Sequence, residues 1–81
     1  MNIVDLYISN LRKEDITNFA LKKDIKLSKD ELDFTYDFIK NHYKEVMNDK
    51  YKYNFNDYRK YFSEENFNKI DKLIKEYINY L

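Results

Sequence analysis

The chain contains neither glycine nor proline in its 81 residues. Because these two residue types are the strongest breakers of helices and strands, element boundaries must be read here from capping residues and hydrophobic periodicity. The absence of glycine also excludes phosphate-binding glycine loops and the dinucleotide-binding fingerprint. Cysteine is absent as well, which excludes disulfides, thiolate zinc sites, thiol nucleophiles and iron–sulfur clusters.

The length of the chain fits one small domain, which we place at residues 1–81. A domain of this size buries only about 60–65% of the surface of its unfolded chain, so its core needs large side chains. Nine tyrosines and six phenylalanines supply that volume. No apolar stretch approaches the roughly 18 residues of a membrane span. Residues 1–11 lack the features of a signal peptide, so we expect a cytoplasmic protein without membrane attachment.

Helical spacing of apolar residues predicts two short helices in the first 28 residues. The apolar stripe of the first comprises Ile3, Val4, Tyr7, Ile8 and Leu11. The inner face of the second comprises Ile16, Phe19 and Ala20. The segment 24–27 is expected to connect onward with Ile25 and Leu27 turned inward.

A capping box is the sharpest local signal in the sequence. Ser28 is followed three residues later by Glu31, a spacing that lets each side chain bond the backbone amide of the other. It predicts a long helix over about residues 29–48. Phe34 and Phe38 lie beside the apolar stripe of this helix, so we expect it to contact neighbours on two sides.

Two further helices are predicted after a loop around residues 48–50. Asn54 or Asn56 can cap a short aromatic helix, and Ser63 can cap the last one. The fold class is therefore all-α, with four or five helices packed around the long helix at about 29–48. The expected core comprises Leu32, Tyr36, Ile39, Tyr43, Val46, Phe67, Ile70, Ile74 and Ile78.

The segment 15–20, followed by Ile25-Lys26-Leu27-Ser28 and Leu32, resembles a small helical family of low-GC Gram-positive bacteria, a domain of unknown function. The similarity covers about residues 10–47. It implies an all-helical fold and a bacterial cytoplasmic protein. The family offers no catalytic residues to carry over.

Residues able to carry catalysis or bind a metal are scarce. The single histidine, His42, has only Glu45 as a nearby helical carboxylate, and no nucleophile motif accompanies it. The acidic residues 30–37 spread around a helix and lack the glycine of a calcium loop. We expect no enzymatic activity, no catalytic residues, no metal and no cofactor.

Aromatic residues outnumber the positions that so small a core offers, and tyrosine is enriched at protein interfaces. We therefore predict a protein-interaction or regulatory module that binds another protein or a second copy of itself through an aromatic surface patch. The residues assigned to the patch are Tyr51, Tyr53, Tyr58 and Tyr61, with Phe34 at its margin.

Two alternatives to this interpretation remain open. The basic aromatic segment 50–61 could bind single-stranded nucleic acid by phosphate contacts and base stacking, although the chain has zero net charge. Alternatively, the aromatics are core material from an AT-rich codon pool, since Lys, Asn, Tyr and Ile make up 40 of the 81 residues.

Charge is distributed unevenly along the chain. Residues 29–49 carry six carboxylates and three lysines, whereas residues 50–62 carry four basic side chains and one carboxylate. These two segments are expected to pair within one chain or between two.

Overall fold

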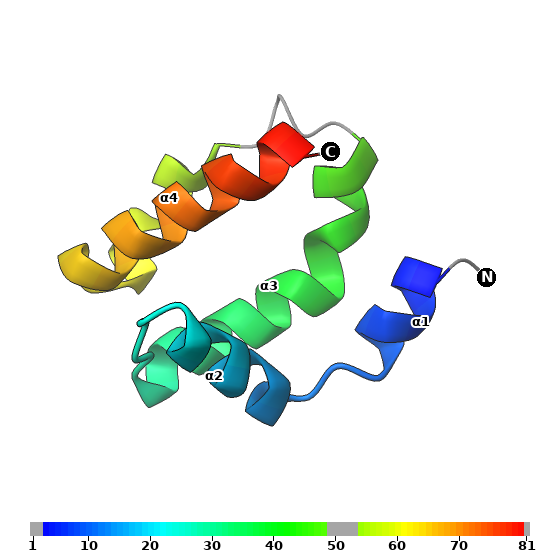
Figure 1. Cartoon of the computed structure of the whole chain (residues 1–81), viewed down its shortest axis with the longest axis horizontal. Helices are drawn as coiled ribbons and strands as arrows, with labels where there is room; N and C mark the ends of the chain where they lie inside the picture. Colours follow the sequence, from blue (N-terminus) through cyan, green and yellow to red (C-terminus); the bar gives the residue numbers. More distant parts are fainter. Residues whose placement is uncertain (1–2, 49–53, 81) are drawn as a thin grey trace.

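Helices form all the regular secondary structure in the part of the chain that the structure describes, residues 3–48 and 54–80 (Figure 1). The computed structural model contains four α-helices and one 3-10 helix among these residues. In chain order they are α1 (Ile3–Ser9), α2 (Lys13–Lys22), α3 (Lys29–Asn48), η1 (Phe55–Tyr61) and α4 (Glu64–Tyr80). The all-α fold class and the long helix at 29–48 are confirmed.

Glu31 joins the N-terminal ends of α3 and α4. The predicted capping box is present, because the Glu31 amide donates to Ser28 Oγ at 3.2 Å and the Ser28 amide donates to Glu31 Oε1 at 2.8 Å. The other carboxylate oxygen, Oε2, accepts from the Ser63 amide at 2.8 Å, and Asn66 Nδ2 donates to Oε1 at 2.9 Å. Glu31 is only 5% exposed. We call this group of Glu31, Ser28, Ser63 and Asn66 the Glu31 joint.

The chain leaves α2 through a residue in the left-handed conformation. Asp24 has a φ of 61°, and its amide donates to the Leu21 carbonyl at 3.1 Å. The Ile25 amide reaches back to the Ala20 carbonyl at 2.8 Å, which completes a Schellman motif. Ile25 and Ala20 are both buried, so the turn also carries the hydrophobic contact typical of this motif.

Polar contacts attach the two N-terminal helices to α3. The Lys40 ammonium donates to the carbonyls of Ile8 at 2.7 Å and Ser9 at 3.1 Å, at the C-terminal end of α1. The Tyr43 hydroxyl donates to Asp5, also on α1. α2 is linked to α3 by an ion pair of 2.9 Å between Lys13 and Asp33.

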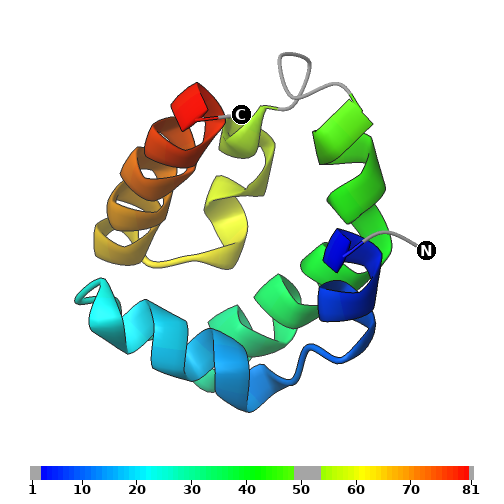
Figure 2. The same ribbon diagram turned by 45° about the vertical axis from the view of Figure 1, so that its right-hand side comes forward.

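α4 packs on η1, on the side of the molecule opposite α1 (Figure 2). The rings of Phe55 and Phe67 stack with centroids 4.8 Å apart and an interplanar angle of 3°. The Arg59 guanidinium lies 4.2 Å from the centroid of Phe67, which is the most completely buried large side chain described. Asn66 also donates to the Lys26 carbonyl at 2.9 Å, which ties α4 to the segment before α3.

The core differs from the predicted one. Its buried apolar residues are Leu11, Ile16, Ala20, Ile25, Phe55 and Phe67. Of the predicted core only Phe67 is fully buried; the half-buried members are Leu32, Tyr36, Ile39, Tyr43, Ile70 and Ile74. The side chains of Val46 and Ile78 lie outside the described part. The reason is that α4 rests on η1 rather than on α3, so the apolar stripes of α3 and α4 do not interdigitate.

The predicted inner face of α2 is partly wrong, and much of the apolar stripe of α1 is exposed. Ile3, Tyr7 and Phe19 are 82%, 65% and 45% exposed. Because α1 has seven residues and packs on α3 alone, most of its apolar circumference has no neighbour among the described residues. Leu6 and Leu21 extend this exposed apolar surface.

Candidate protein-interaction surface

An aromatic cluster forms where η1 packs on α3. Phe34 and Phe38 are four residues apart on α3 and so lie on the same face of that helix. Residues three apart eclipse one another in a 3-10 helix, which aligns Phe55, Tyr58 and Tyr61 along one face of η1. The two rows of rings therefore face each other along the contact between the helices.

The rings of this cluster contact one another directly. Phe34 and Tyr61 are stacked, with centroids 4.1 Å apart and an interplanar angle of 8°. Tyr58 lies between the two phenylalanines of α3, with its centroid 5.8 Å from that of Phe34 and 4.9 Å from that of Phe38. We call these four residues the α3–η1 aromatic surface. Offset and edge-on ring pairs of this kind stabilise a contact beyond the area that they bury.

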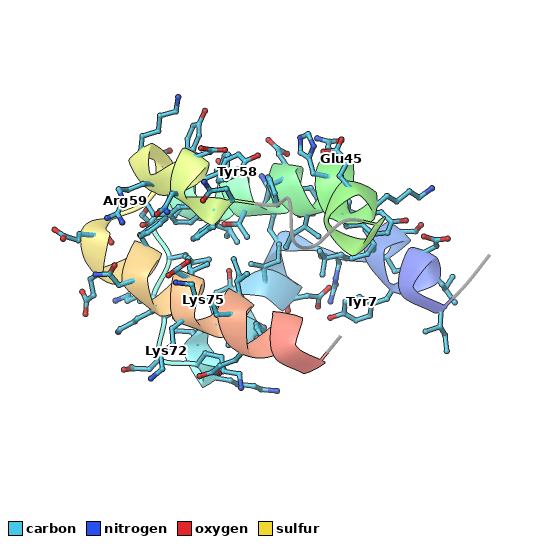
Figure 3. All side chains as sticks on the ribbon, turned by 90° about the horizontal axis from the view of Figure 1, so that it is seen from above. Tyr7, Glu45, Tyr58, Arg59, Lys72 and Lys75 are labelled. Carbon is cyan, nitrogen blue, oxygen red and sulfur yellow. The ribbon has the colours of Figure 1, made fainter. Side chains whose placement is uncertain are left out.

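This cluster reaches the molecular surface. Tyr61 is 43% exposed although one of its faces is stacked on Phe34. The other three members are half-buried. Figure 3 shows Tyr58 on the same edge of the molecule as Glu45 of α3, while Arg59 lies where η1 meets α4. The cluster thus both holds η1 on α3 and leaves part of its ring surface exposed to solvent.

A basic group borders the aromatic surface. The Lys60 ammonium lies 5.3 Å from the centroid of Tyr61, within cation–π range. The expected charge pairing between the acidic and basic segments is not seen among the described residues of α3 and η1, where aromatic contacts replace it. The carboxylate of Asp33 pairs instead with Lys13 of α2, which lowers the pKa of Asp33 chiefly through their hydrogen bond.

His42 extends the cluster toward the C-terminal end of α3. Its ring centroid lies 5.2 Å from that of Phe38, and its Nδ1 lies 3.4 Å from a carboxylate oxygen of Glu45. Both His42 and Glu45 are exposed. The histidine is therefore a ring at the margin of a surface rather than a group held within a pocket.

Three of the five residues predicted for the patch come together. Phe34, Tyr58 and Tyr61 form direct ring contacts, whereas Tyr51 and Tyr53 lie outside the described residues. Phe38 is the member that sequence reasoning did not assign to the patch. Its spacing of four residues from Phe34 is the signal that could have identified it.

Residues 3–48 and 54–80 contain no group of three or more His, Cys, Asp or Glu side chains placed to hold a metal ion. Within the same ranges no helix combines the length and the apolar character that crossing a bilayer requires. In comparisons with known proteins, no family model, no curated protein and no solved structure matches this chain.

Proposed function

We propose that this chain is a non-catalytic protein-interaction or regulatory module of the bacterial cytoplasm, and that it binds another protein through the α3–η1 aromatic surface. The observation that carries the proposal is the stacked pair of Phe34 and Tyr61, in which Tyr61 remains 43% exposed. A ring fixed in this way loses little side-chain entropy on binding, which is why tyrosines act as anchors at interfaces. The partner can also be a second copy of the chain, which carries the same aromatic surface.

Site-specific photo-crosslinking in the source cells tests this proposal. Benzoylphenylalanine placed at position 61 is expected to give a discrete protein adduct. The matched control carries the same group at position 76, where Glu76 is exposed on α4. Adducts of equal yield from both positions, or from neither, would contradict the proposal. An adduct at twice the mass of the chain would identify a second copy as the partner.

Single-stranded nucleic acid is a second candidate ligand of the same surface. It is favoured by the Lys60 ammonium beside the exposed ring of Tyr61, since phosphate contacts and base stacking require such neighbours. The test is titration of labelled oligo-dT and oligo-rU at low salt. Binding that weakens steeply with salt and with Lys60→Glu would support it. The control is Lys44→Glu, which changes an exposed lysine of α3 outside the aromatic surface. If the chain binds neither oligonucleotide, this candidate is removed.

A further inference from the structure

An apolar cleft of about 270 Å³ lies between α4 and the other three α-helices. Within the described residues, α4 packs closely on η1 and meets α3 at the Glu31 joint, so the rest of its backbone stays away from α1, α2 and α3. The cleft occupies the space thus left. Its facing walls include Ala20 of α2, Ile39 of α3 and, from α4, Ile70 and Leu73.

Of the polar side chains that line the cleft, Thr35 and Asp15 are already engaged, and Tyr7 stands at the edge that the cleft shares with its outer groove. The Thr35 hydroxyl donates to the Glu31 carbonyl at 2.8 Å. The Asp15 carboxylate accepts from the Arg12 amide at 2.9 Å and lies 3.6 Å from the Arg12 guanidinium. A bound water needs two to four polar partners, which these walls do not offer. The cleft therefore suits a hydrocarbon group.

The volume of the cleft sets the size of that group. An apolar cavity of about 150 Å³ accommodates benzene, with its six carbons. On the same scale a cleft of about 270 Å³ accommodates about ten carbons. One turn of an α-helix, about 10 Å across with its side chains and about 5.4 Å long, needs more volume than this cleft offers. A single extended alkyl chain fits.

The cleft opens into a wider groove between α1 and α2, and the two spaces share Tyr7, Leu11, Asp15 and Phe19. Tyr7 extends from α1 toward the side on which α4 lies (Figure 3). The outer groove is lined by Asn10, Asn18 and Lys22 as well. Lys22 is exposed and forms no ion pair with any residue that the structure describes. A cation with amide neighbours at the mouth of an apolar cleft complements an anionic head on an alkyl tail.

We infer that this cleft binds a free medium-chain aliphatic carboxylate of about ten carbons, with its tail among Ala20, Ile39 and Ile70 and its carboxylate at Lys22. Asp15, the carboxylate at the same mouth, is already paired with the Arg12 guanidinium at 3.6 Å, which offsets part of its repulsion of the anion. This site is separate from the α3–η1 aromatic surface.

Calorimetric titration of the whole chain with sodium decanoate, below its micellar concentration, tests the inference. We expect one molecule bound per chain and a rise in melting temperature. Affinity should increase from hexanoate to decanoate and should not increase further to hexadecanoate. Decanol, which has the same tail and no charge, should bind about tenfold more weakly, the equivalent of one charge-assisted hydrogen bond. Equal affinity for decanol would overturn the assignment of the head group to Lys22.

Paired variants locate the two ends of the ligand. Ala20→Leu places additional volume inside the cleft and should abolish decanoate binding, whereas Leu21→Phe on the exposed side of α2 should not. Lys22→Gln should bring the affinity for decanoate down to that for decanol. Its matched control, Lys29→Gln, changes an exposed lysine away from the groove and should have no effect.

Ala20 is buried, so its variant could fail to fold. Circular dichroism monitors the fold, and Ile70→Phe fills the same cleft from its half-buried α4 wall. A folded filling variant that still binds decanoate as the parent does would overturn the proposal. The same holds if the parent chain shows neither heat nor a shift in melting temperature.

Discussion

Glu31 is a buried carboxylate whose partners are amides and a hydroxyl rather than a cation. Burial alone would raise its pKa. The hydrogen bonds from the backbone amides of Ser28 and Ser63, from Asn66 and from the Ser28 side chain outweigh burial, so the pKa of Glu31 lies below its usual value of 4.5. A carboxyl whose pKa is lower in the folded than in the unfolded chain stabilises the fold above the unfolded pKa. That stabilisation is lost as the pH falls through the folded pKa.

We therefore predict that the free energy of unfolding falls as the pH drops below about 4.5, in part through Glu31. Glu31→Gln replaces an acceptor oxygen with a donor facing an amide and should cost about 1–3 kcal/mol at pH 7. The deficit relative to the parent chain should shrink on acidification. Urea unfolding at pH 7 and at pH 3.5 measures both effects. Glu64→Gln, on an exposed residue of the α4 first turn, is the control, and an equal loss in this variant would contradict the prediction.

Asp24 holds a conformation that glycine adopts at lower cost. A side chain with a Cβ disfavours the left-handed region, in which Asp24 lies at φ 61°. Its carbonyl, which accepts from Lys69 at 2.8 Å, is retained in any substitution. Its exposed carboxylate lies 3.6 Å from the same ammonium, an ion pair of small value. Asp24→Gly should stabilise the chain by about 0.5–1 kcal/mol in thermal unfolding. Lys23→Gly, at the preceding φ of −101°, should not stabilise it.

At the level of elements, α1 depends on α3 for its position. A helix of seven residues is too short to be stable alone in water. Lys40→Met keeps an apolar stem but removes the ammonium that caps the carbonyls of Ile8 and Ser9. We predict a loss of about 1.5–3 kcal/mol, the value of a hydrogen bond to a charged group, together with a loss of helical NMR chemical shifts over residues 3–9. Lys44→Met changes an exposed lysine one turn later on α3. It should leave both the free energy of unfolding and the chemical shifts of residues 3–9 unchanged.

The contact of η1 with α3 rests on stacked rings, and a double-mutant cycle measures it. Phe34→Ala, Tyr61→Ala and the double variant should give a coupling energy of about 0.5–1.5 kcal/mol in urea unfolding. The same cycle on Phe34 and the exposed Phe19 of α2 should give a coupling near zero. A coupling of similar size in both cycles would mean that the ring stack contributes nothing specific.

Local signals in the sequence predicted where the helices begin better than they predicted which side of each helix is buried. The Ser28–Glu31 box marked the start of α3, and Asn54 caps η1 by accepting from the Asn56 amide at 3.0 Å. Such caps act within four residues and need no tertiary partner. The partner of each apolar stripe, by contrast, depends on how the helices pack. Periodicity therefore placed Phe19 inside, where the structure leaves it 45% exposed.

For the whole molecule, the burial of each side chain determines how much stability is lost when that side chain is truncated to Ala. Phe67 is only 1% exposed and is stacked on Phe55. Phe67→Ala should therefore lower the free energy of unfolding by about 3–5 kcal/mol. Ile39 was predicted to be core, but it is half-buried on a cleft wall. Ile39→Ala should therefore cost less, about 1–2 kcal/mol. Chemical denaturation of the two variants gives the order, and a larger loss for Ile39 would show that the cleft is closed in solution.

The candidate interaction surface was predictable only in part. The sequence placed Phe34, Tyr58 and Tyr61 in one aromatic set, because the excess of rings and their spacing are visible without a structure. It could not reveal that the contact between α3 and η1 is aromatic rather than ionic. Net charges of segments say nothing about which side chains meet. The sequence also gave no sign of the cleft, because a cleft depends on how the helices pack against one another.

The Glu31 joint has a consequence for the opening motions of the chain. The amides of Ser28 and Ser63, 35 positions apart, donate to the two oxygens of one carboxylate. Any fluctuation that withdraws Glu31 must expose both amides to solvent together. Their hydrogen–deuterium exchange rates should therefore report one shared opening free energy, and the first turns of α3 and α4 form a single cooperative unit although they begin far apart in the sequence.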